Sequence, residues 1–522
     1  MTMNRIPQLV SAFVFLVISG CASLPENTNR QESYAFNKPE TTELGKKYAQ
    51  RAVKHPAGQS AYHLLSDGLD AFVARAALAQ VADHSIDSQY YMVHGDLVGL
   101  LYMDQLLKAA DRGVRVRFLL DDMDEGGRDF SLAKFDYHPH IEVRIFNPFG
   151  RNTGKTMQFL TGFGKQTRRA HNKSFTMDNI ATIVGGRNIG DEYFDADGVM
   201  DFADLDVLGI GPIAKQVSAS FDQYWNHSLS YPISLLVKEK PTAEDYRKGR
   251  AKLEKFIAEQ SESAYLKSLR NSELAESVRN KDVVYHWADG KVFADPPDKL
   301  LMKTGDKAYQ MWTDLKPYVA KAESELLIIS PYFVPGDNGV EFLAGLVKKG
   351  VRVRVLTNSL ASTDVSVVHA GYARYRKALL RAGIELHELN KKTAKSSRQA
   401  VRQGKIGTSE TSLHAKTFIV DRKTVFIGSL NLDARSVIQN TEIGIVIDST
   451  DIAELMSDRI DDNIDRAAFK LALDVDDDGN EHTTWTGLID DKQKTLTTEP
   501  YTSFWKRFVT SFLRLMPIES QI

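Results

Sequence analysis

The 522-residue sequence predicts an α/β fold built from two copies of one unit, each with a mainly parallel or mixed sheet flanked by helices. Strand-like segments alternate with helical segments in both copies, which favours this class. The string Gly-Val-Arg-Val-Arg occurs at residue 113 and again at residue 350, and one polar motif also occurs twice. The spacing between equivalent positions drifts by a few residues, as loop insertions within a duplicated domain produce.

Each element of the first copy follows from its hydrophobic pattern. Residues 85–91, 113–120 and 141–146 are short and rich in β-branched, aromatic or other apolar residues, which predicts three strands. Leucines recur at helical spacing across residues 97–110, between the first two strands, and predict a helix.

The second copy repeats this order. Residues 326–333, 350–356 and 384–387 predict strands, and residues 340–349 predict the helix between the first two. Between the copies, residues 243–278 are polar and charged and predict one or two surface helices. A Pro-Pro pair then marks a break before the second copy begins.

Length and composition set the domain count. A chain of this length predicts about two to four domains, and the 43% of hydrophobic residues suffices for sizeable cores. We divide the chain into a signal segment, a tether, a first domain, a helical connection, a second domain and a C-terminal hairpin with an amphipathic segment: 1–20, 21–60, 61–235, 236–300, 301–460 and 461–522.

The N-terminus carries the three-part pattern of a signal peptide. Arg5 gives a short positive start, residues 9–20 are largely apolar, and small residues precede Cys21, the only cysteine. This end resembles the lipobox of bacterial lipoproteins, in which the cysteine becomes the lipid-modified first residue. Ala22 in place of aspartate implies sorting to the outer membrane. We therefore expect a membrane-anchored lipoprotein facing the periplasm; an ordinary signal peptide with a chance cysteine is the alternative.

The repeated polar motif reads H-x-K-x4-D-x6-G-[GS]-x-N, with no slip in spacing between its copies. The members of the two copies are His171, Lys173, Asp178, Gly185 and Asn188, then His414, Lys416, Asp421, Gly428 and Asn431. A single H-x-K-x4-D string would carry little weight. Two copies inside a detectable duplication make coincidence a poor explanation.

These residue types suit the chemistry of a phosphodiester. Strand alternation points the histidine and lysine of each motif to one side. One histidine can attack phosphorus and the other can protonate the leaving alkoxide, so that a phosphohistidine splits one hard displacement into two easier ones. The groups able to bind the phosphoryl oxygens are Lys173, Lys416, Asn188, Asn431 and Ser429.

Carboxylates near the motifs have two predicted roles. An attacking histidine needs a partner on its other ring nitrogen. Aligning the two copies sets Asp204 opposite Glu442, and these are the candidate histidine-orienting residues. Asp178 and Asp421, the acidic members of the catalytic motifs, end their strands at turns. We interpret them as structural residues that hold the hairpins, more than as reacting groups.

The motifs resemble the HKD motifs of the phospholipase D superfamily, and the resemblance spans the chain from about Leu65 to its C-terminus. Further strings, such as Phe146-Asn147-Pro148-Phe149 and Ser330-Pro331-Tyr332-Phe333, resemble a bacterial cardiolipin synthase group. The resemblance implies two phospholipase D-like α/β domains, each a mixed sheet flanked by helices, related by pseudo-two-fold symmetry. It also implies one active site at their interface that uses no metal or other cofactor.

The same resemblance implies an activity. In many members the histidine of the first motif is the nucleophile, which assigns attack to His171 and the acid role to His414. The subgroup implies transfer of a phosphatidyl group between phospholipids, with phosphatidylglycerol as acceptor and phosphatidylethanolamine as donor. Because both motifs lie in one chain, oligomerisation is not required to build the site.

Other functions remain open from the sequence alone. The same residues could hydrolyse phospholipids, since nothing in the sequence shows how water would be excluded. A nuclease is disfavoured by the net charge of −2 and the expected lipid anchor, because nucleic-acid binders usually show a basic footprint. A non-catalytic lipid-binding lipoprotein is disfavoured because both histidines, both lysines and both asparagines are intact.

Three further segments have competing interpretations. The C-terminal residues 504–516 form an apolar stripe flanked by basic residues, which fits either an interfacial helix at a membrane or a last helix packed on the core. Residues 474–479 resemble the start of a calcium loop, but a tight turn between two strands is favoured because Trp485 stands where the loop needs glutamate. Asp121 and Asp122 at a strand end are interpreted as solvated loop acids.

Overall fold

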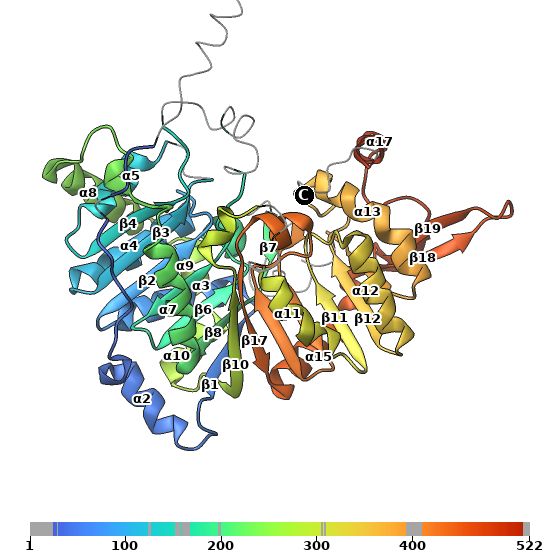
Figure 1. The fold of residues 1–522 in the computed structure, drawn as a ribbon, viewed down its shortest axis with the longest axis horizontal. Helices are drawn as coiled ribbons and strands as arrows, with labels where there is room; N and C mark the ends of the chain where they lie inside the picture. Colours follow the sequence, from blue (N-terminus) through green and yellow to red (C-terminus); the bar gives the residue numbers. More distant parts are fainter. Residues whose placement is uncertain are drawn as a thin grey trace, which may run out of the picture.

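The structure is a computed structural model that describes residues 24–28, 30–123, 127–151, 158, 167–196, 200–303, 306, 310–392 and 410–514. Two α/β halves lie side by side, one drawn in blue to green and the other in yellow to red (Figure 1). The duplicated α/β fold predicted from the sequence is therefore confirmed. Cys21 and the signal segment before it lie outside the described residues.

One mixed sheet of 18 strands runs through both halves. Its strands in the first half are β1 (Ser60–Leu65), β2 (Ser85–Tyr90), β3 (Arg115–Asp121), β4 (Ile141–Phe146), β5 (Ser174–Met177), β6 (Ala181–Gly185), β8 (Asp206–Ile210) and β9 (Ser230–Pro232). Those after the connection are β10 (His286–Ala294), β11 (Glu325–Ile329), β12 (Arg352–Thr357), β13 (Glu385–Leu389), β15 (Thr417–Val420), β16 (Thr424–Gly428), β17 (Ile443–Asp448), β18 (Ala468–Val475), β19 (Glu481–Ile489) and β20 (Lys492–Leu496).

The pairing of the strands is symmetric about the middle of the sheet. The first half has the order β9-β4-β3-β2-β5-β6-β8-β1, with β2, β3 and β4 parallel to one another. The second half mirrors it as β10-β17-β16-β15-β11-β12-β13 and adds β18, β19 and β20. The equivalent strands β1 and β10 pair antiparallel, with Ala61 opposite Trp287, as a pseudo-two-fold axis between the halves requires.

Helices flank the sheet. They are α2 (Glu43–Ala52), α3 (Gly68–Val81), α4 (Leu97–Asp111), α5 (Asp129–Asp136), α7 (Pro212–Trp225), α8 (Ala243–Gln260), α9 (Ala264–Arg270), α10 (Glu273–Asn280), α11 (Met311–Ala320), α12 (Gly336–Lys348), α13 (Ser366–Arg381), α15 (Thr450–Asp461), α16 (Ile464–Ala467) and α17 (Phe504–Leu513). Short 3-10 turns lie at Pro39–Thr41, Asp191–Tyr193, Ile233–Leu235 and Pro297–Leu300, and a π-helical turn lies at Arg435–Gln439.

The repeated Gly-Val-Arg-Val-Arg string marks the same joint in both halves. Gly113 follows α4 with φ of 93°, and Gly350 follows α12 with φ of 92°. Glycine adopts this left-handed conformation without the steric cost that a Cβ brings. Each glycine therefore ends a helix and starts the chain back into the sheet, where β3 and β12 begin two residues later.

A shared apolar core joins the two halves. It combines Val184 and Val207 of the first half with Ile427 and Ile445 of the second, all fully buried. The strands that carry them face one another, since β6 contacts both β16 and β17 across the layer. Burial of this shared surface, rather than a flexible linker, holds the halves together. The loops at the ends of these strands are thereby brought to one place.

Some predicted bounds differ from the structure. The connection folds as three helices, α8, α9 and α10, rather than one or two, because Ser263 and Ser272 each accept a backbone N–H and start a new helix. β11 ends at Ile329, four residues earlier than predicted. The turn predicted at residues 474–479 is confirmed, because it joins the antiparallel pair β18 and β19. Within the described ranges, no helix is long and apolar enough to cross a membrane.

Candidate active site

Both H-x-K motifs lie immediately before a strand rather than within it. His171 and Lys173 precede β5, and His414 and Lys416 precede β15. Each lysine ammonium donates to the backbone carbonyl of its own histidine, with Nζ–O distances of 2.7 Å for Lys173 and 2.5 Å for Lys416. All four residues are buried, and none of them is more than 9% exposed. This places two histidines and two ammonium groups in the interior between the halves.

Backbone bonds across the interface fix each motif to the opposite half. The amide of His171 donates to the carbonyl of Thr441 at 2.9 Å, and the amide of His414 donates to the carbonyl of Ala203 at 2.9 Å. Two further strands, β7 (Met200–Ala203) and β14 (Glu410–Leu413), pair in parallel across the interface just before Asp204 and His414. The register of the two halves therefore sets the position of both histidines.

The orienting carboxylates cross between the halves. His171 Nδ1 lies 2.8 Å from Glu442 Oε2, and His414 Nδ1 lies 2.6 Å from Asp204 Oδ2. The histidine of each half thus takes its carboxylate partner from the other half. Gly186 makes room for one of them, since a Cβ at this position would meet Asp204 Oδ1 at 2.2 Å.

Two tyrosines that the sequence did not single out line the site. Tyr91 packs edge-on against His171, with ring centroids 5.0 Å apart, and Tyr193 packs edge-on against His414 at 5.2 Å. Asn188 Nδ2 donates to the hydroxyl of Tyr193 at 2.9 Å. Tyr91 follows the last residue of β2, and that position at a strand end was the one signal the sequence offered.

Burial governs the charge of the basic groups. It lowers the pKa of His171 well below the ordinary histidine value, and the nearby Lys173 and Lys416 lower it further. Burial likewise lowers the pKa of Lys173 to about 7 and that of Lys416 to about 8. A negatively charged phosphate between the lysines would favour their protonated forms.

The two histidine–carboxylate pairs are electrostatically unequal. Burial raises the pKa of Glu442 to about 7. Burial also acts to raise the pKa of Asp204, but the neighbouring His414 and Lys416 outweigh it and hold that pKa below the ordinary value. Burial and the nearby Lys416 lower the pKa of His414, and Asp204 opposes this shift in part. The His414–Asp204 pair therefore retains a carboxylate charge that favours an imidazolium.

Ser429, a predicted phosphate ligand, contacts one of the orienting carboxylates. Its hydroxyl donates to Glu442 Oε2 at 2.5 Å and accepts the backbone N–H of Ile443 at 3.0 Å. It therefore supports the carboxylate that holds His171. Asn188 and Asn431 are buried beside the motifs, and the Oδ1 atom of each has no hydrogen-bond partner among the described residues. Their side-chain amides remain the candidate ligands for phosphoryl oxygens.

The aspartates of the motifs lie at the opposite end of their strands from the histidines. Asp178 accepts the backbone N–H groups of Asp83, His84 and Ser85 at 2.7 to 2.8 Å, at the start of β2. Asp421 accepts those of residues 323–325 in the same way at the start of β11. Asp178 and Asp421 have φ of 51° and 52° in their hairpin turns. These contacts tie each hairpin to the neighbouring strand.

Asp121 and Asp122 are buried, so the interpretation of both as solvated loop acids is wrong. Asp121 accepts Arg169 Nε at 2.9 Å and the N–H of Ala170 at 2.9 Å, directly before His171. Asp122 is paired with Arg151. Buried carboxylates persist where such partners satisfy them, and the partner arginines lie far along the chain. Asp121 is thus a positioning residue for the first motif.

The comparison with known families rests on this duplicated site. The sequence model of the cardiolipin synthase PLD-like domain matches the chain twice, at residues 76–225 and 315–464. The two matches cover more than half of the chain and each contains one motif. The chain belongs to the phospholipase D superfamily. This member of the superfamily carries both motifs in one polypeptide.

Two curated relatives align with nearly the whole chain. Cardiolipin synthase C of Escherichia coli K12 is 42% identical over 468 residues, which is 89% of this chain and 97% of that protein. An uncharacterized protein of Helicobacter pylori 26695 is 32% identical, over 97% of this chain and 98% of that protein. Among solved structures, phosphatidylserine synthase of Haemophilus influenzae shares the fold, with a TM-score of 0.51 at 12% identity over 81% of this chain and 91% of that one.

Two further polar features lie apart from the phospholipase D motifs. In the described part of the chain, His94, Asp96 and Glu192 form the one group of metal-ligating side chains that approach one another. His94 Nδ1 lies 3.3 Å from Glu192, and Asp96 caps α4 by accepting the N–H of Gly99. These contacts are those of a partly exposed ion pair and a helix cap.

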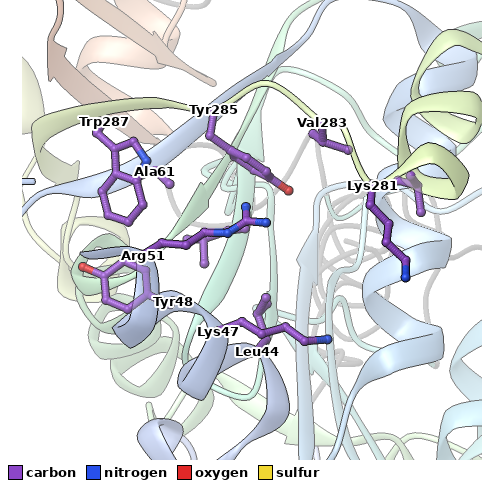
Figure 2. A pocket seen from close by; sticks show the side chains of 11 residues that line it. Leu44, Lys47, Tyr48, Arg51, Ala61, Lys281, Val283, Tyr285 and Trp287 are labelled. Carbon is purple, nitrogen blue, oxygen red and sulfur yellow. The ribbon is translucent and has the colours of Figure 1, made fainter. Parts of the chain in front are cut away.

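A cavity of about 450 Å³ lies between α2, β1 and the beginning of β10. Aromatic residues and three cations line it, and Figure 2 shows the guanidinium of Arg51 reaching toward Tyr285. None of the motif residues lines this cavity. In Figure 1 its helix α2 lies at the opposite end of the molecule from α17. The candidate active site is therefore the buried interface and not this cavity.

Proposed function

We propose that this enzyme makes cardiolipin, by transferring a phosphatidyl group from phosphatidylethanolamine to phosphatidylglycerol through a phosphohistidine. Its class, a phospholipase D-type phosphatidyltransferase, follows from the family and from the relative that is 42% identical over 468 residues. One observation carries the chemistry: two histidines, each bound to a buried carboxylate, lie with two lysines at the interface of the halves.

The proposed first step breaks the bond between phosphorus and the headgroup oxygen of the donor. With Nδ1 of His171 bound to Glu442, its Nε2 attacks phosphorus. His414 gives its proton to the departing ethanolamine oxygen. Lys173 and Lys416, with the amides of Asn188 and Asn431, stabilise the phosphoryl oxygens.

The second step reverses these roles. His414, now neutral, takes the proton from a hydroxyl of phosphatidylglycerol, and that oxygen attacks phosphorus. The bond between phosphorus and His171 breaks, which releases cardiolipin and restores a neutral His171. Water in place of the lipid hydroxyl would give phosphatidic acid, so hydrolysis is the same chemistry with a different acceptor.

The unequal pairs support the assignment of roles. A nucleophile must be neutral, and burial with two nearby ammonium groups keeps the pKa of His171 low. An acid must carry a proton. Burial and Lys416 lower the pKa of His414 too, but Asp204 opposes them, so that pKa is lowered less than the pKa of His171. We therefore propose His171 as nucleophile and His414 as acid, then base.

We also propose a location for the enzyme. The lipobox-like sequence ending at Cys21 supports a lipid anchor, and Ala22 supports the periplasmic side of the outer membrane. There the enzyme would meet both phospholipids in the bilayer that holds it. Labelling with radioactive palmitate, followed by separation of inner and outer membranes, tests this placement against a Cys21→Ser chain.

The lipid composition of cells tests the activity. The full chain, expressed in a bacterium without its own cardiolipin synthases, should produce cardiolipin that mass spectrometry detects. His171→Ala and His414→Ala should produce none, whereas His482→Ala, a histidine on the remote strand β19, should match the unaltered chain. Phosphatidic acid in place of cardiolipin would identify a hydrolase. Folded, exported protein with no lipid change would contradict the proposal.

The pH dependence of kcat/KM should be bell-shaped. As pH falls, Glu442, with its pKa raised to about 7, gains a proton and can no longer accept from His171. As pH rises, Lys173 and Lys416, with pKa values lowered to about 7 and about 8, lose the charge that binds phosphate. Rates on phospholipid vesicles between about pH 5 and about pH 9 test both limbs. Glu442→Gln should remove the acid limb from its residual activity, and an unchanged acid limb would assign that limb to another group.

A further inference from the structure

The apolar side of α17 faces solvent. Phe504, Trp505, Phe508, Val509 and Phe512 are between 52% and 71% exposed. Their spacing places them on one face of the helix. Three of the rings also contact one another, with centroids 5.6 to 6.2 Å apart among Phe504, Trp505 and Phe508. We call these five residues the aromatic ridge.

The opposite side of α17 fixes this orientation. Thr510 is buried, and the helix packs against α13. Arg374 of α13 donates to the carbonyl of Arg514, and Arg507 donates to the carbonyl of Thr502 at 2.6 Å. A last helix that packs its aromatic residues on the core is therefore not what the structure contains. The apolar stripe points outward because the polar side makes the contacts.

The charge around the ridge favours one kind of partner. The segment from Pro500 to Arg514 contains no aspartate or glutamate but includes Lys506, Arg507 and Arg514. Exposed aromatic rings beside basic residues are typical of helices that lie in the headgroup region of a membrane. Anionic headgroups attract such cations when they lie near the bilayer surface. Bulk water gives the exposed rings of α17 no comparable stabilisation.

The ridge lies at the same end of the molecule as the active site. Figure 1 shows α17 above the level of β7, the strand that leads into Asp204. Its neighbour α13 begins just after Asp364, whose charge acts on Lys416. The described N-terminal residues reach this end too: the side chain of Asn27 binds the carbonyl of Ser230, opposite the last residue of β4.

We propose that the aromatic ridge docks the enzyme on an anionic phospholipid bilayer and turns the active-site end toward the lipid. This inference deepens the proposed function and rests on it in one respect, because it takes the substrates to be bilayer phospholipids. The ridge enters the boundary between headgroups and acyl chains. The basic residues of the helix contact phosphate groups.

Vesicle binding tests the docking without any turnover. The full chain carrying Cys21→Ser, which removes the expected site of lipid attachment, is sedimented with vesicles of phosphatidylethanolamine and phosphatidylglycerol. The triple variant Phe504→Ser, Trp505→Ser and Phe508→Ser should bind about 100-fold more weakly. The control variant Val53→Ser, Val284→Ser and Val475→Ser alters residues that are 64% to 82% exposed elsewhere, and should bind as before.

Fluorescence quenching separates a bilayer from a second copy of the chain. Vesicles with brominated acyl chains should quench tryptophan emission, and Trp505→Phe should lose most of this quenching while it still binds. Equal binding by the triple variant, or equal affinity for neutral phosphatidylcholine vesicles, would overturn the proposal. Light scattering that shows a ridge-dependent dimer without vesicle binding would assign the surface to self-association.

The same experiment distinguishes failure of docking from failure of the proposed function. His171→Ala should bind vesicles as the unaltered chain does, because His171 is buried between the halves and is not part of the exposed ridge. Ridge-dependent binding by a chain that makes no cardiolipin would retain the docking and reject the function. If the ridge substitutions left both cardiolipin synthesis and vesicle binding intact, the function would be retained and the docking rejected.

Discussion

Alanine at His171 and alanine at His414 should both stop phosphatidyl transfer, but at different steps. Losing the nucleophile should lower kcat on the order of 10⁵-fold with every donor. Losing the acid should block the first step only when the leaving group needs a proton. With a phosphatidyl ester of p-nitrophenol, which departs unprotonated, His414→Ala should release one equivalent of nitrophenolate and then stall, because the second step lacks its base.

Rapid-mixing kinetics and mass spectrometry at neutral pH test this difference. The stalled His414→Ala enzyme should carry a phosphatidyl group on the peptide that contains His171, and His171→Ala should carry none. His482→Ala serves as the matched control and should turn over normally. A burst from His171→Ala and none from His414→Ala would reverse the two roles. Steady turnover by the unaltered enzyme with no adduct in any variant would point to direct displacement.

Glutamine at Glu442 should disable His171 although the two residues belong to different halves. Glutamine keeps the size of the side chain but removes the charge that holds the imidazole in one tautomer, so kcat should fall by about 10³-fold or more. Asparagine at Asp204 should have a comparable effect through His414. The p-nitrophenol donor should restore the first step in Asp204→Asn, because no acid is needed, and should not restore it in Glu442→Gln.

A double-mutant cycle makes the crossing of the pairs measurable. Once His171 is alanine, Glu442→Gln should lower kcat little further. The two residues act together in one step, so removing either one already abolishes that step. Thermal unfolding should show that each variant keeps its fold before rates are compared. If the p-nitrophenol donor rescued Glu442→Gln and not Asp204→Asn, each histidine would instead depend on the carboxylate of its own half.

The duplication could be predicted from the sequence because strings repeat along it. Gly113 and Gly350 each have a positive φ at a helix-to-strand joint. Both copies therefore need glycine at this position, because a Cβ would be strained in that conformation. Helical spacing and β-branched runs placed α4, β3 and β4 close to their observed bounds. Such features depend on residues near in the chain, which a single sequence can show.

The crossing of the carboxylates could not be predicted, because it depends on the docking of the halves. Alignment of the copies sets Asp204 opposite Glu442, but it does not say which histidine each one meets. The contact of the Ser429 hydroxyl with Glu442 could not be predicted either, because it depends on the fold of the second half. From the sequence alone Asp121 is interpreted as a loop acid, because its partner Arg169 reaches it only in the folded chain.

The exchange of carboxylates between the halves has a consequence during synthesis of the chain. A ribosome completes His171 long before it reaches Glu442. A polypeptide released early, or clipped within its helical connection, would hold His171 without Glu442. It would also contain only those proposed phosphate ligands that belong to the first half. Because the two pairs form only when both halves have docked, an unfinished copy has neither histidine bound to its carboxylate.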